Sequence, residues 1–385
     1  MKKIVSLKEV CESDYGVTAS ATEQPTGTHF LRITDIVNFT DYSGVPFVDI
    51  DDEDRRKKLL KQNDIVVART GATVGASHLF RGTEPTVFAS YLVRFRPKTS
   101  DVDPVFVSYV LNSPAWKQFI FANAHSKSAQ PNLSAAAMMD FQFSLPEIRE
   151  QQKIASVLKA LDDKISTNSR IIKIATHLNI NLVEKSVTKK LEHLQNLADI
   201  TMGSSPKGEF LNEEGIGEPF FQGVRDFGEL FPSERVFAEK AVRTAQEGDI
   251  LFAVRAPIGE VNIAERPCVI GRGIAAIRGK QSHLGLFYLL KGHPELWETY
   301  QSSGTVFAGI NKSDLHNAVI PVLRDFEKLE QQLTPIHERA MHALRENQTL
   351  ASTRDELLPL LMSGRITVGE AEDAADVAGT AASES

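Results

Sequence analysis

Two stretches of about 40 residues, 147–190 and 325–362, contain few glycines and many strong helix formers. An α-helix rises ~1.5 Å per residue, so a 40-residue helix is roughly 60 Å long. That length exceeds the width of a globular domain of the size that the rest of this chain allows. The chain therefore cannot fold as one compact body, and we expect the two helices to act as spacers.

Each helical stretch begins with a similar motif. LPEIREQQKI at 145–154 returns in a looser form as IPVLRDFEKLEQQL at 320–333. The second copy has extra residues before its Glu-Gln-Gln, and it carries two prolines inside the helical pattern. We expect Thr334-Pro335 to cap the regular part of the second helix and Pro359 to kink or end it.

The regions between the helices repeat as well. NDIVVAR at 63–69 matches GDILFAV at 248–254, YLVRFR at 91–96 matches IAAIR at 274–278, SPAW at 113–116 matches HPELW at 293–297, and QPNLS at 130–134 matches AGINK at 308–312. These matches occur in the same order in both halves, so the chain is predicted to contain two copies of one repeat.

Short alternating segments, glycines, prolines and asparagines predict a mixed, mostly β domain in each repeat. The predicted class is α+β with pseudo-two-fold symmetry. The predicted parts are a first β domain (1–145), a first long helix (146–190), a second β domain (191–322), a second long helix (323–365) and a tail (366–385). The tail is acidic and rich in small residues, which predicts disorder.

Apolar residues recur at three- and four-residue steps along both helices, which favours an antiparallel coiled-coil pair. The alternative is that each helix packs only on its own domain. Asn168 and Asn347 occupy equivalent positions in the two apolar stripes. A buried Asn lowers stability but fixes register. We expect both near the middle of the pair, and replacing both by Leu should then raise the melting temperature.

Several features of the composition limit the possible functions. No apolar run approaches the ~18 residues that a membrane span needs, and MKKIVSLKEV lacks the apolar core of a signal peptide. Cys11 and Cys268 lie far apart and outside any metal-binding spacing. These features predict a cytoplasmic protein without a disulfide framework or a metal site.

The sequence has no P-loop, HExxH, GxSxG or Gly-rich nucleotide motif. Asp64 and Asp249 each follow a turn residue and precede an apolar strand, so we interpret them as turn caps. Neither repeat offers a paired acid and base, a nucleophile or a metal cluster. We therefore predict no catalytic residues, no cofactor and no enzyme activity for this chain itself.

Polar loop residues are the candidate nucleic-acid contacts. RTGATVG at 69–75 and VRAPIG at 254–259 place an Arg just after a strand, beside glycines that allow close backbone approach. HSKSAQPN at 125–132 offers side chains that contact base edges and phosphates. The predicted DNA contacts are Arg69, Thr70, Lys127 and Gln130 in the first domain, and Gln222, Arg225, Arg255 and Lys312 in the second.

The net charge is unfavourable for a DNA-binding protein acting alone. The chain carries 43 basic and 50 acidic residues, a formal charge of −7. Isolated nucleic-acid binders are usually basic, because phosphate neutralisation supplies most of their affinity. DNA binding therefore requires a basic partner to share the contact.

Several of these runs together resemble the specificity (S) subunits of type I restriction–modification systems. The runs are 145–165, 63–75, 128–134 and 357–366, with GDIL at 248–251 and EQQ at 330–332 in the second copy. The resemblance covers about residues 5–366. It implies that each β domain is a target recognition domain for one half of a split DNA sequence. Because the two domains differ in sequence, the target should be asymmetric.

The resemblance also implies that the helices hold the domains apart and dock two methyltransferase (M) subunits. Restriction (R) subunits would join through that core, and S-adenosylmethionine, ATP and Mg²⁺ are expected on the partner subunits. If the M subunits supply the phosphate contacts, the charge objection is answered. Helices of roughly 60 Å then predict a gap of about 5–8 unspecified base pairs.

Two other classes of function are compatible with the sequence. The chain is alternatively a coiled-coil scaffold that binds other proteins, or an enzyme with an unrecognised site. Neither alternative accounts as simply for two divergent domains on matched helices.

Overall fold

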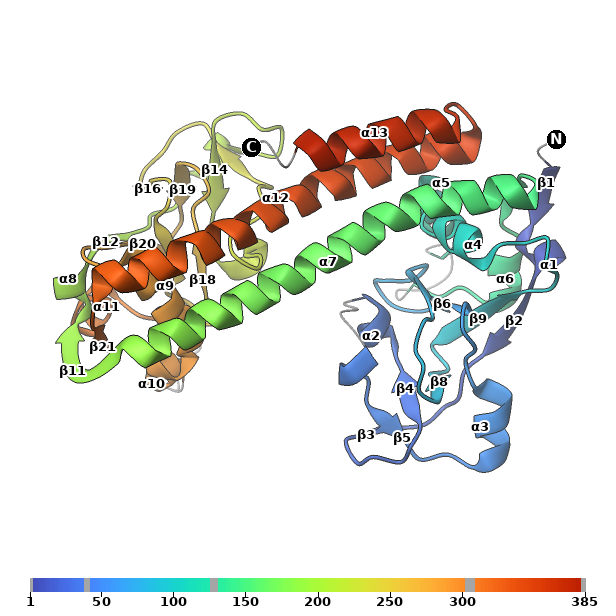
Figure 1. Ribbon diagram of the computed structural model, residues 1–385, viewed down its shortest axis with the longest axis horizontal. Helices are drawn as coiled ribbons and strands as arrows, with labels where there is room; N and C mark the ends of the chain where they lie inside the picture. Colours follow the sequence, from blue (N-terminus) through green and yellow to red (C-terminus); the bar gives the residue numbers. More distant parts are fainter. Residues whose placement is uncertain (1–2, 38–41, 125–130, 302–308, 382–385) are drawn as a thin grey trace. The chain divides into compact units, whose positions relative to one another are not determined.

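The computed structural model describes residues 3–37, 42–124, 131–301 and 309–381 (Figure 1). The chain divides into two compact units. The first unit contains residues 1–165 and 348–384, and the second contains residues 166–347. Each unit consists of one β-rich domain and a part of each long helix.

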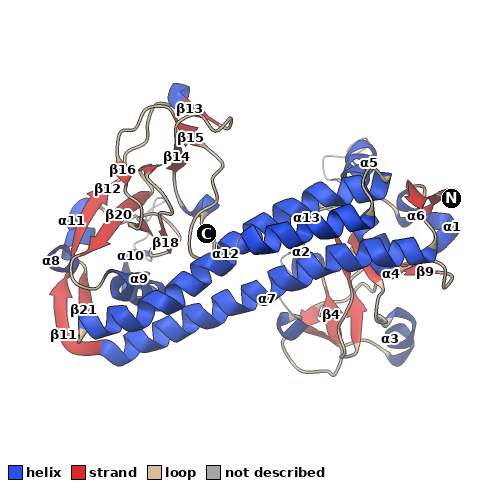
Figure 2. Ribbon diagram, turned by 45° about the horizontal axis from the view of Figure 1, so that its top comes forward, coloured by secondary structure: helices blue, strands red, loops and turns tan. Residues whose placement is uncertain are grey.

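The first unit has three small sheets (Figure 2). β1 pairs antiparallel with β10, and two four-stranded sheets have the orders β2-β9-β6-β7 and β3-β5-β4-β8. The strands are β1 (Lys3–Ser6), β2 (Cys11–Tyr15), β3 (Ala21–Thr22), β4 (His29–Leu31), β5 (Phe47–Val48), β6 (Ile65–Ala68), β7 (Ser77–Leu79), β8 (Thr86–Phe88), β9 (Leu92–Pro97) and β10 (Gln142–Leu145).

The second unit repeats this plan. β11 pairs antiparallel with β21, and the other sheets have the orders β12-β20-β17-β18 and β13-β15-β14-β19-β16. The strands are β11 (Val187–His193), β12 (Ala198–Met202), β13 (Leu211–Asn212), β14 (Glu218–Phe221), β15 (Phe237–Ala238), β16 (Thr244–Ala245), β17 (Ile250–Ala253), β18 (Val261–Ile263), β19 (Cys268–Ile270), β20 (Ile274–Gly279) and β21 (Val319–Leu323).

Short helices cover these sheets in corresponding places. The first unit contains α1 (Leu7–Val10), α2 (Ile33–Val37), α3 (Asp52–Lys58), α4 (Pro104–Val110), α5 (Pro114–Ala124), α6 (Ala135–Met139) and the 3-10 turn η1 (Tyr42–Gly44). The second contains α8 (Leu194–Leu197), α9 (His283–Gly292), α10 (Glu298–Gln301), α11 (Lys312–Asn317) and the 3-10 turns η2 (Gly208–Phe210), η3 (Val224–Asp226) and η4 (Pro294–Trp297).

The predicted duplication is confirmed by strand pairing. β4 pairs parallel with β8, and β14 pairs parallel with β19, while the neighbouring pairs in both units are antiparallel. The α+β class is also confirmed, with two β-rich domains and two long helices that pack together.

Glycines in the two Gly-containing turns serve packing. Gly75 and Gly259 have φ values of 88° and 94°, which favour glycine. A Cβ on Gly75 would lie 2.7 Å from Ile120, and one on Gly259 would lie 2.3 Å from the Trp297 ring. The Trp116 indole N–H also donates to the Gly75 carbonyl at 2.8 Å. These two glycines therefore let the turns close over the core, rather than over a ligand as the sequence suggested.

The long helices are α7 (Ile148–Ser186) and α12 (Phe326–Ser363). Each is attached to a β domain by one polar side chain near its start. Gln151 is fully buried; its amide donates to the carbonyls of Pro146 and Asp101 at 2.8 and 3.0 Å, and it accepts from the Asp103 N–H at 2.9 Å. Asp103 is the N-cap of α4.

Glu330 makes the corresponding attachment in the second unit. Its carboxylate accepts from the Ser282 hydroxyl at 2.6 Å and from the Leu284 N–H at 2.9 Å, at the start of α9. Glu330 is thus the structural equivalent of Gln151. An alignment of the two Glu-Gln-Gln motifs would instead pair Gln151 with Gln331. The second copy has extra residues because β21 continues through Pro321 to Leu323 before α12 begins.

The two helices run antiparallel, as predicted. In the first unit Arg354 of α12 donates to Asp162 of α7 at 2.8 Å. In the second unit Asn168 of α7 contacts Glu346 of α12, and Asn179, further along α7, contacts Leu333, which comes earlier in α12. Buried apolar side chains line both parts of the seam, namely Ile154, Val157, Leu158, Leu161, Leu350, Leu357 and Leu361 in the first unit and Ile172, Ala175, Val183, Leu329, Leu333, Ala340 and Ala343 in the second.

The two predicted seam asparagines do not bond to each other. The Asn168 amide is fully buried and donates to the Glu346 carboxylate at 2.7 Å, and Glu346 is itself 3 % exposed. The Asn347 amide donates to the Ser169 hydroxyl at 3.2 Å. The polar layer therefore contains a buried carboxylate that the apolar spacing did not reveal.

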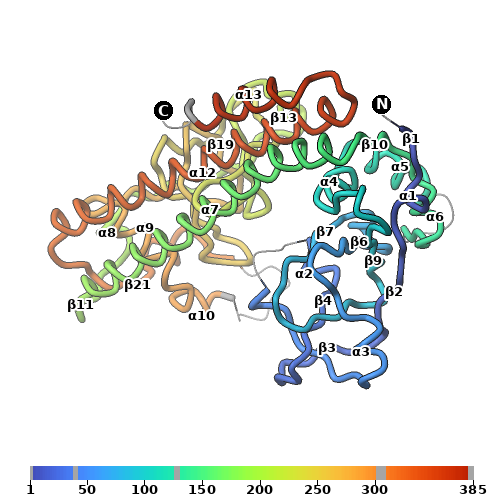
Figure 3. Tube along the Cα trace, turned by 45° about the vertical axis from the view of Figure 1, so that its right-hand side comes forward, coloured from blue at the N-terminus to red at the C-terminus, as the bar shows by residue number. Residues whose placement is uncertain are grey.

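Two expectations for the C-terminal region are wrong. α12 begins at Phe326 and ends at Ser363, so it neither starts at Thr334-Pro335 nor ends at Pro359, and the buried Leu333 and Leu358 stabilise the helix despite the two missing N–H groups. Residues 368–381, predicted to be disordered, form helix α13 (Val368–Ala381), which lies along α12 (Figures 1 and 3). Ala371 is fully buried in the first unit's core, so the small residues pack closely against it.

Replacing Gln151 by Leu tests the attachment of α7 to the first β domain. The variant leaves the Asp103 N–H and two carbonyls buried without their partner, which should cost about 1–3 kcal/mol of unfolding free energy. Chemical denaturation measures this loss. Gln152→Leu, at the adjacent exposed position, is the matched control and should change stability little.

Replacing Asn168 by Leu tests the polar layer in the seam. Because this variant removes a donor from the buried Glu346 carboxylate, we expect a lower melting temperature, with a loss of about 1–3 kcal/mol. Adding Glu346→Leu should recover stability, since the charge then disappears with its donor. A rise in melting temperature for Asn168→Leu alone would support the simpler expectation from the sequence.

Candidate nucleic-acid interface

In the second β domain, five turns meet along one edge of the sheets, here called the second edge: residues 203–205, 222–223, 254–255, 271–273 and 309–312. Backbone hydrogen bonds join them in series. Ile310 N donates to Val254 O at 2.8 Å, Val254 N to Gly273 O at 2.9 Å, Gly273 N to Gln222 O at 3.2 Å, Gly271 N to Phe221 O at 2.9 Å, and Gly203 N to Ile274 O at 2.9 Å. Side chains on these turns are therefore held on one rigid support.

The first β domain has the same construction along its first edge: residues 16–17, 31–32, 69–71, 89–91 and 131–134. Leu133 N donates to Arg69 O at 2.9 Å, Arg69 N to Tyr91 O at 3.0 Å, and Ala89 N to Leu31 O at 2.9 Å. Corresponding bonds in the two series identify the equivalent residues. The two edges thus share a backbone and differ in their side chains.

Arg69 and Thr70, predicted as DNA contacts, both lie on the first edge. The Arg69 guanidinium sits 5.0 Å from the centre of the Tyr15 ring and donates to Asn132 at 3.3 Å. Thr70 forms a bridge with Asn132. The other two residues predicted in this domain, Lys127 and Gln130, lie outside the described residues.

The four residues predicted in the second domain are all exposed. Gln222 and Arg255 lie on the second edge, and Lys312 is the first residue of α11, just after its N-cap Asn311. Arg225 lies in η3, three residues beyond Gln222. The structure therefore brings Gln222, Arg255 and Lys312 to one support and puts Arg225 beside it.

The two arginines of the repeated turns are not structurally equivalent. Arg69 O accepts from Leu133 N, whereas in the second domain Val254 O accepts from Ile310 N. The Thr70–Asn132 bridge likewise corresponds to the Arg255–Gly309 bridge. Arg255 therefore replaces Thr70 and not Arg69, as the sequence match of Arg69 with Val254 indicated, so the two arginines occupy positions that differ by one residue.

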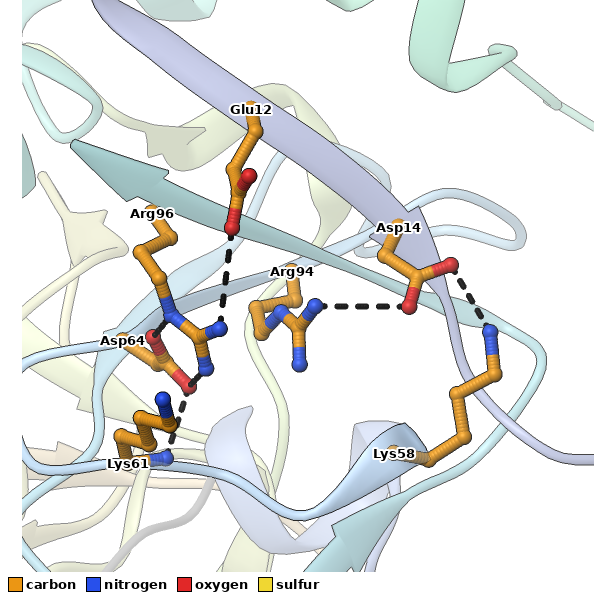
Figure 4. Close-up of polar contacts among 7 residues, drawn as sticks. All are labelled: Glu12, Asp14, Lys58, Lys61, Asp64, Arg94 and Arg96. Atoms are coloured by element: carbon orange, nitrogen blue, oxygen red, sulfur yellow. Dashed lines mark hydrogen bonds and ion pairs between the residues drawn. The ribbon is translucent and has the colours of Figure 1, made fainter. Parts of the chain in front are cut away.

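Asp64 and Asp249 serve the fold, as interpreted from the sequence. Asp64 caps its turn by accepting from Lys61 N at 2.7 Å, and it accepts two bonds of 2.6 Å from Arg96 of β9 (Figure 4). Asp249 repeats this arrangement with Gln246 N at 2.7 Å and Arg278 at 2.6 Å. Both carboxylates are buried under their own turn and are already paired with a guanidinium.

A second network beside Asp64 is also structural. Arg94 is 7 % exposed and donates to Asp14 at 3.3 Å, and Lys58 donates to the other oxygen of Asp14 at 2.8 Å (Figure 4). This network ties α3 to the β2–β9 pair. The basic residues in it are neutralised within the domain and are poorly placed to contact phosphate.

Four buried groups, two thiols and two imidazoles, have strongly shifted pKa values. Burial raises the pKa of the Cys11 and Cys268 thiols to about 12, so both stay protonated and unreactive near neutral pH. Burial also lowers the pKa of His78 and of His337 to about 4, which leaves both rings neutral. His337 accepts from or donates to the Tyr288 hydroxyl at 2.9 Å, a contact between α12 and α9 that serves packing.

Among the residues that the structure describes, no group of three or more His, Cys, Asp or Glu side chains is arranged to hold a metal ion. Within the same ranges, no helix combines the length and apolar character that crossing a membrane requires.

Sequence reasoning missed several residues on the two edges. Tyr91 is 60 % exposed on the first edge, and Arg272 is exposed on the second, in the turn Gly271-Arg-Gly273 between β19 and β20. The sequence does show an Arg between two glycines where one strand ends and the next begins. This pattern was not recognised as part of the repeat, because the first domain has Ser90-Tyr91 at the corresponding positions.

Comparisons with known proteins agree on one family. Residues 2–176 and 187–329 match the family model described as the type I restriction modification DNA specificity domain. The chain is 26% identical over 400 residues to the putative type I restriction enzyme MjaX specificity subunit of Methanocaldococcus jannaschii, covering 95% of this chain and 94% of that protein. It is 25% identical over 289 residues to the MjaIX specificity subunit of the same organism, covering 63% and 65%.

A solved structure has the same fold. The type I restriction–modification S subunit from M. genitalium aligns with a TM-score of 0.60 at 16% identity, over 94% of this chain and 96% of that one. The family model covers most of the chain in two segments, one for each repeat. The chain belongs to the type I restriction–modification DNA specificity family and is the non-catalytic specificity subunit of such a system.

Proposed function

We propose that each β domain of this specificity subunit reads one half of a bipartite, asymmetric sequence in double-stranded DNA. In this proposal the first edge contacts one half-site and the second edge contacts the other. The α7–α12 pair sets the spacer and docks two methyltransferase subunits, which bind S-adenosylmethionine and methylate adenine N6. Restriction subunits join through that core.

The observation that carries this proposal is the pair of edges. The same hydrogen-bonded turns occur in both domains, yet they carry Arg69, Thr70 and Asn132 in one and Arg255 and Gly309 in the other. A shared backbone with different polar side chains suits two readers of different sequences. Arg and Asn side chains at fixed positions are the groups that discriminate base edges in the major groove.

The charge distribution supports shared binding with a partner. Several basic side chains of the first domain are already paired with carboxylates, including Arg94 with Asp14 and Arg96 with Asp64. The whole chain carries a charge of −7. The specificity subunit would then supply base contacts, and the methyltransferase subunits would supply most of the phosphate contacts.

The isolated chain should bind DNA weakly, with a Kd on the order of micromolar or above at physiological salt. Adding the methyltransferase subunits should produce tight, sequence-specific binding, because they bring the phosphate contacts. Fluorescence anisotropy with and without the partner, on a target and a scrambled duplex, measures this difference. Nanomolar specific binding by the chain alone would contradict the shared-contact model.

Methylation by the reconstituted complex should occur at a split site with a gap of about 5–8 unspecified base pairs. Arg69→Ala and Arg255→Ala should each relax specificity by about 1–3 kcal/mol at one position, in different halves. Single-molecule sequencing of methylated DNA provides the readout, and each variant is the control for the other. One contiguous site would exclude the two-reader proposal.

A further inference from the structure

Among the described residues, Arg272 has no internal side-chain partner, unlike three other arginines of the second domain. Arg235, Arg266 and Arg278 form ion pairs with carboxylates at 2.6–3.1 Å. Arg272 is exposed, and its guanidinium makes no hydrogen bond or ion pair with any residue that the structure describes. An unpaired guanidinium on a rigid turn is available for an external acceptor.

The backbone at Arg272 is fixed by its neighbours. A Cβ on Gly273 would lie 2.4 Å from the Gln222 carbonyl oxygen, and one on Gly271 would lie 2.5 Å from Gln222 Oε1. Glycine on both sides of Arg272 therefore lets this turn lie directly against Gln222. The close contact places the two side chains on adjacent positions of the second edge.

Ser205 links Arg272 to Gln222. The Ser205 hydroxyl accepts from the Arg272 backbone N–H at 3.2 Å and donates its hydrogen to Gln222 Oε1 at 2.7 Å. The Gln222 oxygen is thus engaged inside the protein, which leaves its amide NH₂ group for an outside acceptor. Arg272 and the Gln222 NH₂ group, here called the donor-only pair, present donors, and the Gln222 oxygen already accepts one hydrogen bond from Ser205.

In the major groove, guanine offers two acceptors, N7 and O6, and Arg binds them with two hydrogen bonds. Adenine offers one acceptor and one donor, so a Gln reads it only when the Gln oxygen is available. At the second edge that oxygen already accepts from Ser205, which leaves it less available to an adenine N6 amine. The donor-only pair therefore fits a guanine better than an adenine.

The first edge has a different chemistry at the equivalent positions. Ser90 replaces Arg272, and the 60 % exposed Tyr91 replaces Gly273. Arg32 replaces Gln222, but its guanidinium is paired with Asp35 at 2.9 and 3.0 Å. The donor-only pair therefore belongs to the second domain.

We propose that Arg272 is a specificity-determining residue that reads a guanine in the half-site of the second domain, with Ser205 as the positioning residue that holds Gln222 beside it. This inference rests on the proposed function. It adds a residue and the identity of the base that this residue selects.

The test uses the full chain reconstituted with its methyltransferase subunits on a randomised DNA library, read by single-molecule methylation sequencing. Arg272→Ala should lose roughly 5- to 150-fold discrimination for guanine at one position. The other half-site should keep its specificity. Arg272→Lys keeps the charge but not the two-pronged geometry, so it should retain overall methylation and still tolerate other bases. Ser205→Ala should admit adenine beside guanine.

Arg266→Ala removes an exposed arginine that is already paired with Glu234, and it should leave the recognised sequence unchanged. Arg69→Ala identifies the half-site of the first domain, which Arg272→Ala should not affect. An unchanged sequence for Arg272→Ala, or a uniform loss of methylation without a change in sequence, would overturn the assignment while the split site remained. A contiguous site with the unmodified chain would instead overturn the proposed function.

Discussion

The attachment of each long helix to its β domain depends on one polar residue, the buried Gln151 in α7 and the partly buried Glu330 in α12. Each satisfies backbone groups at the start of a short helix that the sheet supports. A buried N–H or carbonyl without a partner costs about 1–3 kcal/mol, so the helix cannot slide or rotate without losing these bonds. The domain and its part of the helical seam are thereby fixed as one unit. This constraint accounts for the motif that precedes both helices.

The two repeats share their buried turn contacts but differ in the side chains on their edges, and each has a physical reason. Asp64 with Arg96 and Asp249 with Arg278 hold the same turn in both domains, because a buried carboxylate needs a cation and N–H donors wherever that turn is used. Residues on the two edges face outward and carry no such requirement. They can therefore differ, as Thr70 and Arg255 do at equivalent positions, without disturbing the sheets below.

The general architecture could be predicted from the sequence because periodicity and repetition report directly on burial. The helix positions, the duplication and the turn-capping role of Asp64 followed from such patterns. The roles of single residues, by contrast, could not be predicted from these patterns. Matching letters paired Gln151 with Gln331, whereas the hydrogen bonds show that Glu330 makes the attachment that Gln151 makes. α13 was missed because a small-residue, acidic stretch resembles a disordered one until an apolar surface such as that around Ala371 is known.

The polar layer in the seam shows how helix register can be set by more than apolar spacing. Asn168 of α7 donates to Glu346 of α12, and Asn347 of α12 donates to Ser169 of α7. The two hydrogen bonds therefore join adjacent residues on each helix. A one-residue slip would place the buried Glu346 carboxylate against apolar side chains, where it would lack this donor. The layer thus lowers stability relative to an all-leucine seam but makes alternative registers less stable still.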